Sequence, residues 1–185
     1  MKIFALYLMI KPYKNSKWIT EFRTKYDQPD FLHVTLISGR YVEEGKVNEL
    51  KSAVAEALSR VKIEEGDRKI IFNELAADSG TKSDDIFMIN SAENKFVTNI
   101  QEELKIALCK YNNYLNPITK NYEDNFTPHI TVARDFNVQK KEEMMKYFPA
   151  DFVCEGEIES LAMPILNNAT IEERMDLKNI VIFKL

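Results

Sequence analysis

Two short stretches with one shared pattern decide the fold of this chain: Leu32-His33-Val34-Thr35-Leu36 and Pro128-His129-Ile130-Thr131-Val132. They contain both histidines of the sequence, and each histidine is followed by a threonine two positions later. Apolar residues occupy the alternate positions, which is the pattern of a strand with one buried face. Residues i and i+2 of a strand point to the same side, about 6–7 Å apart. We therefore expect His33 and Thr35 to face one side together, and His129 and Thr131 to do the same.

The residue types in these stretches suit acid–base chemistry at a phosphorus atom. Because an imidazole has a pKa near 6.5, one histidine of a pair can accept a proton at neutral pH while the other donates one. Threonine hydroxyls can donate hydrogen bonds to the non-bridging oxygens, where negative charge is held. If both strands face one pocket, His33 and His129 are candidate catalytic residues, and Thr35 and Thr131 are candidate phosphate-binding residues. Two histidines with no consistent carboxylate partner make a poor metal site, so we expect no metal ion and no other cofactor.

The composition is that of a globular protein without a strongly basic surface. The chain has 185 residues, 45% of them hydrophobic and 29% charged, and its formal net charge is −4. This charge argues against duplex DNA as a partner and favours a small nucleotide or an RNA end as substrate. No stretch is long and apolar enough to span a membrane, so we expect a cytoplasmic monomer with no membrane attachment. Cys109 and Cys154 are too few for a disulfide framework and match no metal spacing, so both are expected to be reduced.

Hydrophobic periodicity divides the chain into alternating strands and helices. Strands are expected at 2–10, 32–37, 68–76, 85–90, 128–134, 151–163 and 174–184. Helices are expected at 14–27, 44–61, 93–115 and 138–147, with a polar loop at 116–127. The first histidine strand is expected to end at a turn formed by Ser38 and Gly39.

The order strand, helix, histidine strand, helix, strand occurs twice, with the two histidines 96 positions apart. Self-similarity on this scale indicates a duplication with a pseudo-twofold axis through the active cleft. We therefore predict an α+β fold of two pseudo-symmetric lobes, approximately residues 2–76 and 84–163, with antiparallel sheets facing a central cleft and helices outside. Residues 174–184 are expected to add a closing strand. No long linker separates the lobes, so residues 1–185 are expected to form a single domain.

The two motifs, His33-Val34-Thr35-Leu36 and His129-Ile130-Thr131-Val132, resemble the signature of the 2H phosphoesterase superfamily, which is two copies of His-x-Thr-x flanked by apolar residues. This superfamily includes the bacterial 2′-5′ RNA ligase-like proteins, cyclic phosphodiesterases and 2′,5′-phosphodiesterases. The resemblance covers nearly the whole chain and implies a two-lobed α+β fold. It also implies metal-independent cleavage of 2′,3′-cyclic phosphates or 2′-5′ phosphodiester bonds in RNA ends or small nucleotides. By resemblance, His33 maps to the proton donor and His129 to the proton acceptor, although the spacing of the motifs does not determine that direction.

Other residues near the motifs are weaker candidates for contact with substrate. The second motif runs on to Ala133-Arg134, as it often does in the superfamily, and Arg134 can reach the site if the strand bulges at its end. Tyr7 lies on the face of the first strand that carries small or flexible residues, and it is a candidate to stack on a base. The aromatic residues that flank the motifs more often serve packing than binding; they are Phe31, Tyr41, Tyr122 and Phe126.

Two other functions compete with the enzyme. The chain can be a nucleotide-binding module that keeps the cleft without turnover, since a fold does not determine activity. It can also be a histidine-triad nucleotide hydrolase, but that chemistry needs several histidines on one strand, and here each strand has one. In a purely structural interpretation, each histidine ring forms a hydrogen bond to the backbone, and each threonine is present because β-branched residues favour strands.

Overall fold

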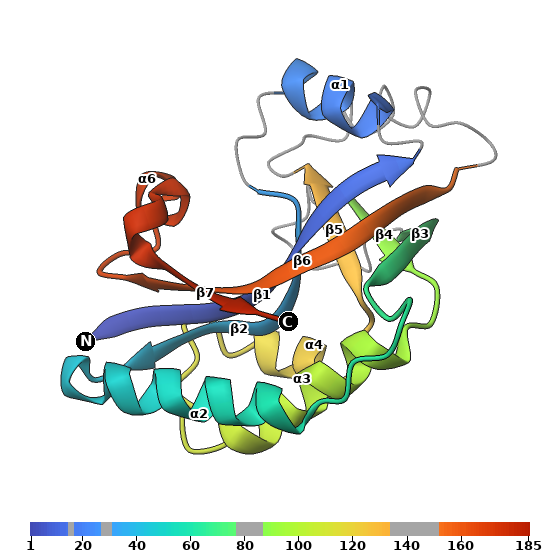
Figure 1. The fold of residues 1–185 in the computed structure, drawn as a ribbon. Coiled ribbons are helices and arrows are strands. Elements are labelled where there is room, and N and C mark those ends of the chain that lie inside the picture. The colour runs from blue at the N-terminus through green and yellow to red at the C-terminus, as the bar shows by residue number, and fades with distance from the viewer. Residues whose placement is uncertain (15–16, 27–30, 77–86, 134–151) are drawn as a thin grey trace.

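The computed structural model of this protein describes residues 1–14, 17–26, 31–76, 87–133 and 152–185. It has an α+β fold, with a seven-stranded sheet and helices outside it (Figure 1). Every strand pairing in the described part of the chain is antiparallel. The predicted fold class is therefore confirmed.

The first repeat unit has the predicted order of elements. These are β1 (Lys2–Lys14), α1 (Lys17–Lys25), β2 (His33–Val42), α2 (Val47–Arg60) and β3 (Lys69–Ala76). A short 3-10 helix, η1 (Glu44–Lys46), leads into α2. The buried residues of α2 are Leu50, Val54 and Ala57, whose spacing of three and four places them on one helical face.

In its described residues the second repeat unit follows the same order, with one additional helix, α4 (Thr119–Asp124), before the histidine strand. Its elements are β4 (Phe87–Ser91), α3 (Lys95–Ala107), α4, β5 (His129–Ala133) and β6 (Cys154–Leu166). The side chain of Asn94 accepts a hydrogen bond from the Val97 amide and so caps the start of α3. The helix expected at 138–147 lies outside the described residues. The chain then adds α6 (Ile171–Met175), η2 (Leu177–Asn179) and β7 (Ile180–Lys184).

The strands close into a ring whose pattern of pairings is twofold. Its order is β1-β2-β5-β4-β3-β6, with β6 also paired to β1, while β7 pairs with the second half of β6. Exchanging β1 with β4, β2 with β5 and β3 with β6 reproduces every pairing of the ring. This symmetry agrees with the repeat in the sequence, and it brings the two histidine strands, β2 and β5, next to each other. The third strand of each unit pairs with the first strand of the other unit.

A glycine allows the ring to close at β6. Gly156 is paired with Pro12 of β1 and with Ile70 of β3. A Cβ atom added at Gly156 would lie 2.8 Å from the Cγ2 atom of Ile10, which is closer than real atoms approach. A residue with a side chain would therefore force Ile10 or the backbone near it to shift.

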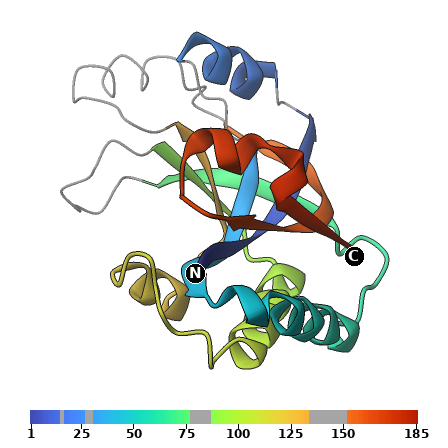
Figure 2. The same cartoon turned by 90° about the vertical axis from the view of Figure 1, so that its left-hand side faces the viewer.

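The helices cover the strands from two sides. α2 and α3 pack side by side against one side of the strands, and α1 lies on the opposite side near β5 (Figures 1 and 2). One hydrophobic core connects strands and helices; its largest fully buried members include Phe4, Leu6, Leu8, Leu50, Phe72, Ile89, Ile100 and Leu104. No helix in the described part of the chain has both the length and the apolar character that crossing a membrane requires.

The first histidine strand is longer than the sequence predicted. β2 does not turn at Ser38 and Gly39 but continues to Val42. The strand bulges there, because Phe4 pairs with Arg40 while Leu6 pairs with Ile37, which gives β2 one more residue than β1 between the two pairs. A Cβ atom at Gly39 would lie 3.3 Å from the Cδ2 atom of Leu115, so the glycine serves a close approach rather than a turn.

The third predicted helix is shorter than expected, and the predicted loop after it contains a helix. α3 ends at Ala107, not at residue 115, because the following chain pairs with β2 instead. The Tyr41 amide donates to the Asn113 carbonyl at 2.7 Å, and the Leu115 amide donates to the Gly39 carbonyl at 2.8 Å. The expected loop 116–127 contains α4.

The last strand begins at Ile180, not at residue 174. Residues 171–179 form α6 and η2 instead, because capping side chains start both helices. The Thr170 hydroxyl accepts a hydrogen bond from the Glu173 amide, and the Asp176 carboxylate accepts one from the Lys178 amide.

Candidate active site

β2 and β5 place the two motifs side by side. Val34 pairs with Ile130 in antiparallel register, and both of these side chains are fully buried. Continuing this register by one residue in each direction sets His33 opposite Thr131, and Thr35 opposite His129. These four side chains are half-buried and alternate with the buried residues, so they share the other face of the sheet. The structure therefore brings together the four residues that the two motifs singled out.

The four side chains stand at the corners of a small quadrilateral, which we call the His–Thr square. The two histidines occupy one diagonal and the two threonines the other. Directly opposite residues have Cβ atoms about 4.5–5.5 Å apart, and diagonal neighbours are about 7–8 Å apart. A phosphate above the centre would have an imidazole on each of two opposite sides and a hydroxyl on each of the other two. An in-line displacement at phosphorus needs such an arrangement, because the attacking and leaving oxygens lie on opposite sides.

The two histidine rings are held in the same way. The Nδ1 atom of His33 lies 2.6 Å from the Phe31 carbonyl oxygen, and the Nδ1 atom of His129 lies 2.9 Å from the Thr127 carbonyl oxygen. A carbonyl only accepts hydrogen bonds, so Nδ1 carries the proton in each ring. In the neutral form the lone pair is then on Nε2, which makes Nε2 the proton-transferring atom of both histidines. Each contact is to the residue two positions earlier, so the second half of the site repeats the first.

On one side of the His–Thr square, β1 contributes large side chains to the same face. Tyr7 pairs with Thr35, and Met9 pairs with His33. The ring of Tyr7 packs against the imidazole of His33, with centroids 4.3 Å apart and an angle of 35° between the planes. Tyr7, which the sequence offered as a base-stacking residue, thus contacts a histidine of the square directly.

On the other side of the square, β4 contributes a polar side chain that the sequence analysis missed. Asn90 pairs with His129, and Met88 pairs with Thr131. The Asn90 amide is half-buried on the face of the square and can donate to or accept from a bound ligand. Nothing in the local sequence marks Asn90, because its importance comes from the register of β4 against β5.

The strand rows around the square contain no carboxylate, and two arginines lie near them. β1, β2, β4 and β5 contribute eight side chains to the paired rows, and none is a carboxylate: Tyr7, Met9, His33, Thr35, Met88, Asn90, His129 and Thr131. Arg23 of α1 donates to the carbonyl oxygens of Thr131 and Val132 at 3.2 and 3.3 Å. Arg174 of α6 lines a hollow together with His33. In a chain of net charge −4 this placement of charge favours an anionic ligand.

Arg23 and Arg174 could not be singled out from the sequence either, since each lies on a helix whose position near the square depends on the whole fold. Arg134, the expected arginine, lies outside the described residues. Of the flanking aromatic residues, Phe31 lines the hollow beside His33, and Phe126 packs against the core. Tyr41 lies at another part of the surface, with Glu43 and Lys110, and Tyr122 is exposed. Within the residues that the structure describes, no three His, Cys, Asp or Glu side chains are grouped so as to hold a metal ion.

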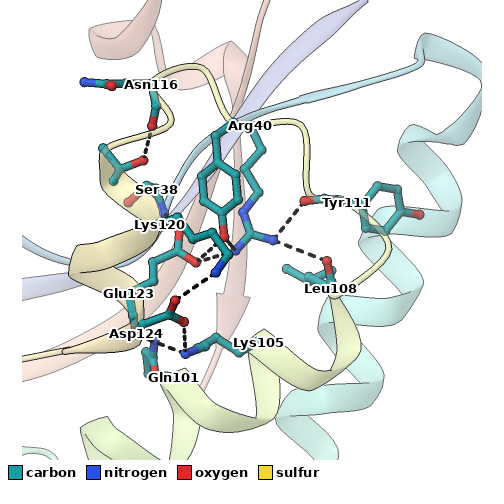
Figure 3. A network of polar contacts seen from close by, with 12 residues as sticks. Ser38, Arg40, Gln101, Lys105, Leu108, Tyr111, Asn116, Lys120, Glu123 and Asp124 are labelled. Carbon is teal, nitrogen blue, oxygen red and sulfur yellow. Dashed lines mark hydrogen bonds and ion pairs between the residues drawn. The ribbon is translucent and has the colours of Figure 1, made fainter.

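A buried ion pair fixes the chain between the two motifs (Figure 3). Arg40 of β2 pairs with Glu123 of α4, and both side chains are almost completely buried. Glu123 also accepts a hydrogen bond from the Ser38 amide at 2.8 Å, and Arg40 donates to the Tyr111 carbonyl at 2.9 Å. These contacts join β2 to α4, which ends at Asp124, a few residues before His129, and so they tie the first motif strand to the chain that leads into the second.

Comparison with solved structures supports the fold. The chain resembles the protein TT0787 of Thermus thermophilus with a TM-score of 0.56 and 16% sequence identity, covering 100% of this chain and 95% of that chain. It resembles Usb1 of Kluyveromyces marxianus, in a structure with uridine monophosphate, with a TM-score of 0.50 and 10% identity, covering 99% and 98%. No protein-family model and no curated protein sequence matches the chain. At these identities the likeness is one of fold, and it extends over the whole length of this chain.

Proposed function

We propose that this protein is a metal-independent phosphoesterase that cleaves 2′,3′-cyclic phosphates or 2′-5′ phosphodiester bonds in RNA ends or small nucleotides. The observation that carries the proposal is the His–Thr square, in which two histidines with the same ring orientation face each other diagonally across two threonines. Both motifs match the 2H phosphoesterase pattern residue by residue.

The histidines divide the proton transfers between them. Following the 2H pattern, Nε2 of His129 takes a proton from the attacking water, whose oxygen forms a bond to phosphorus. The bond between phosphorus and a ribose oxygen breaks, and that oxygen receives a proton from Nε2 of His33. The hydroxyls of Thr35 and Thr131 donate to the two non-bridging oxygens, whose negative charge increases in the transition state.

The charge around the square supports an anionic substrate. Arg23 and Arg174 approach the square from two different helices, and the paired rows contain no carboxylate. The Kluyveromyces marxianus Usb1 structure holds uridine monophosphate, so uridine nucleotides are a suitable first set of probes. The small area of the square fits a single phosphodiester better than a long polynucleotide.

Replacing each histidine tests the proposal. We expect His33→Ala and His129→Ala each to lower kcat by about 10²–10⁴-fold on 2′,3′-cyclic mononucleotides and 2′-5′ dinucleotides. All reactions are run with a chelator and resolved by chromatography, and Thr98→Ala on the distant helix α3 serves as the folded control. Full activity in either histidine variant would rule out the two-histidine mechanism, and loss of wild-type activity in chelator would point to a metal. Binding of a cyclic nucleotide without product over hours would favour a binding module instead.

A further inference from the structure

The two histidines of the square have different neighbours on their outer sides. The residue beside His33 is Met9 of β1, and the residue beside His129 is Asn90 of β4. These positions correspond in the twofold pattern of the ring, which exchanges β1 with β4 and β2 with β5. A thioether is only a weak hydrogen-bond acceptor, whereas an amide side chain both donates and accepts. The square is therefore symmetric in its histidines and threonines but not in the groups that flank the histidines.

Asn90 lies close to His129 because of the type of strand pair that they form. The Ser91 amide donates to the Pro128 carbonyl at 2.8 Å. Hydrogen-bonded and non-hydrogen-bonded pairs alternate along an antiparallel ladder, so the next pair, Asn90 and His129, is of the non-hydrogen-bonded type. Such pairs have Cα atoms about 4.5 Å apart and the closest side chains. The amide of Asn90 is therefore within reach of a water molecule that is hydrogen-bonded to His129.

The neighbour on the other side of Asn90 favours one orientation of its amide. One strand further out, Glu74 of β3 pairs with Asn90, and it is exposed on the same face. A carboxylate accepts hydrogen bonds and does not donate them, so the NH2 group of Asn90 is better matched toward Glu74. The carbonyl oxygen, Oδ1, is then directed toward His129. Among the described residues the Asn90 side chain has no hydrogen-bond partner, so Oδ1 can accept a hydrogen bond from a ligand.

We propose that Asn90 positions the water molecule that attacks phosphorus, on the side of His129, which makes His129 the proton acceptor. The proposal rests on the phosphoesterase function proposed above. As the water oxygen bonds to phosphorus, one of its protons goes to Nε2 of His129, and the other stays on the oxygen and is donated to Oδ1 of Asn90. The bond from phosphorus to a ribose oxygen breaks, and that oxygen takes a proton from Nε2 of His33. Met9 offers no comparable acceptor to hold a water beside His33.

The test compares two nucleophiles that differ in their number of protons. Water has two O–H groups and methanol has one, so a methanol that gives its proton to His129 has none left for Asn90. Hydrolysis of uridine 2′,3′-cyclic phosphate yields uridine monophosphate, and methanolysis yields its methyl ester, which chromatography separates. Both initial rates are measured in one mixture with chelator, at a methanol concentration that leaves the circular dichroism spectrum unchanged. The variants are Asn90→Leu, Asn90→Asp and, as the matched control at the corresponding position, Met9→Leu.

The expected result is a loss that depends on the nucleophile. Asn90→Leu should slow hydrolysis by about 3- to 10-fold, mainly through kcat, which is the effect of losing one hydrogen bond. Methanolysis should not fall, so the ratio of methyl ester to hydrolysis product rises by at least the same factor. Asn90→Asp keeps an oxygen acceptor and should retain the wild-type ratio. The effect of its charge on the pKa of the histidines cancels in this ratio, because both reactions use the same pair. Met9→Leu should also leave the ratio unchanged.

Equal losses of hydrolysis and methanolysis in Asn90→Leu would overturn the proposal, since they would assign Asn90 to the phosphate or to the fold. Unchanged rates in that variant would overturn it too, and so would an equal shift of the ratio in Met9→Leu. If wild type turns over the cyclic phosphate by neither route, the phosphoesterase function itself fails, and this inference fails with it. Turnover in wild type with an unchanged ratio in Asn90→Leu would reject the inference alone.

Discussion

The backbone carbonyls of Phe31 and Thr127 orient the two histidine rings, because each one accepts the Nδ1 proton of the histidine that follows it. The motif residues themselves were predictable, because alternation places i and i+2 on one face and only two histidines exist. Asn90 and Arg174 were not predictable in the same way. Asn90 reaches the site through strand register, and Arg174 through the packing of a short helix, and both are set by contacts distant in sequence.

Removing one threonine hydroxyl tests its role at the phosphate. We expect Thr35→Ala and Thr131→Ala each to lower kcat by about 10²–10³-fold, the usual effect of losing one donor to a developing negative charge. Thr35→Ser and Thr131→Ser keep the hydroxyl and are expected to retain most of the rate. The measurement is steady-state turnover of a 2′,3′-cyclic mononucleotide. Equal rates for the alanine and serine variants would contradict a hydrogen-bonding role.

The two cysteines are expected to differ in reactivity. Burial raises the pKa of the Cys154 thiol from its ordinary value of 9.0 to about 11, whereas Cys109 is exposed. At pH 8 a thiol reagent should label one cysteine in the native protein and two after unfolding. Since the raised pKa belongs to the folded state, the free energy of unfolding should fall as the pH rises from about 9 to about 11. Rapid labelling of both thiols in the native protein would contradict the burial of Cys154.

At the scale of elements, strands and helices whose hydrophobic residues recur at a regular spacing were predictable from the sequence. The residues at which these elements begin and end were not. The buried face of α2 follows the expected spacing, and the repeat of strand, helix and histidine strand is present. The ends shifted where tertiary contacts replaced local preference. The chain after Ala107 leaves the helix and pairs with β2, where the Leu115 amide donates to the Gly39 carbonyl. β2 continues through Gly39, at a position where a side chain would crowd Leu115. Glu123, inside the expected loop, is buried because α4 carries it to Arg40.

The buried ion pair gives a stability prediction at this scale. Glu123→Ala leaves the buried guanidinium of Arg40 without its carboxylate, which should lower the free energy of unfolding by about 3–5 kcal/mol. Glu159→Ala, at an exposed position of β6, should change it by less than about 0.5 kcal/mol. Urea unfolding followed by circular dichroism measures both values. A loss below about 1 kcal/mol for Glu123→Ala would mean that the pair does not hold α4 to β2.

At the scale of the whole molecule, the repeat in the sequence becomes a ring of strands with a twofold pattern of pairings, and the candidate site lies on β2 and β5, the two strands that this pattern exchanges with each other. The register Val34 to Ile130 sets both histidines opposite threonines at once, because the two motifs are copies in antiparallel strands. The repeat in the sequence predicted the symmetry. It did not predict that β3 pairs with β4 of the other unit and that β6 pairs with β1, since hydrophobic periodicity does not specify which strands pair.

The pH dependence of kcat/KM is the most direct test of this account. One histidine must be neutral and the other protonated, so wild type should show a bell-shaped profile with both limbs between about pH 5.5 and 8. The limbs belong to the coupled pair rather than to His33 or His129 individually. Thr35→Ala should lower the rate and keep both limbs of the pH profile. A variant that lacks one histidine should show a profile with one limb missing in whatever activity remains. A flat profile from pH 5 to 9, measured in chelator with chemistry rate-limiting, would contradict acid–base catalysis by the two histidines.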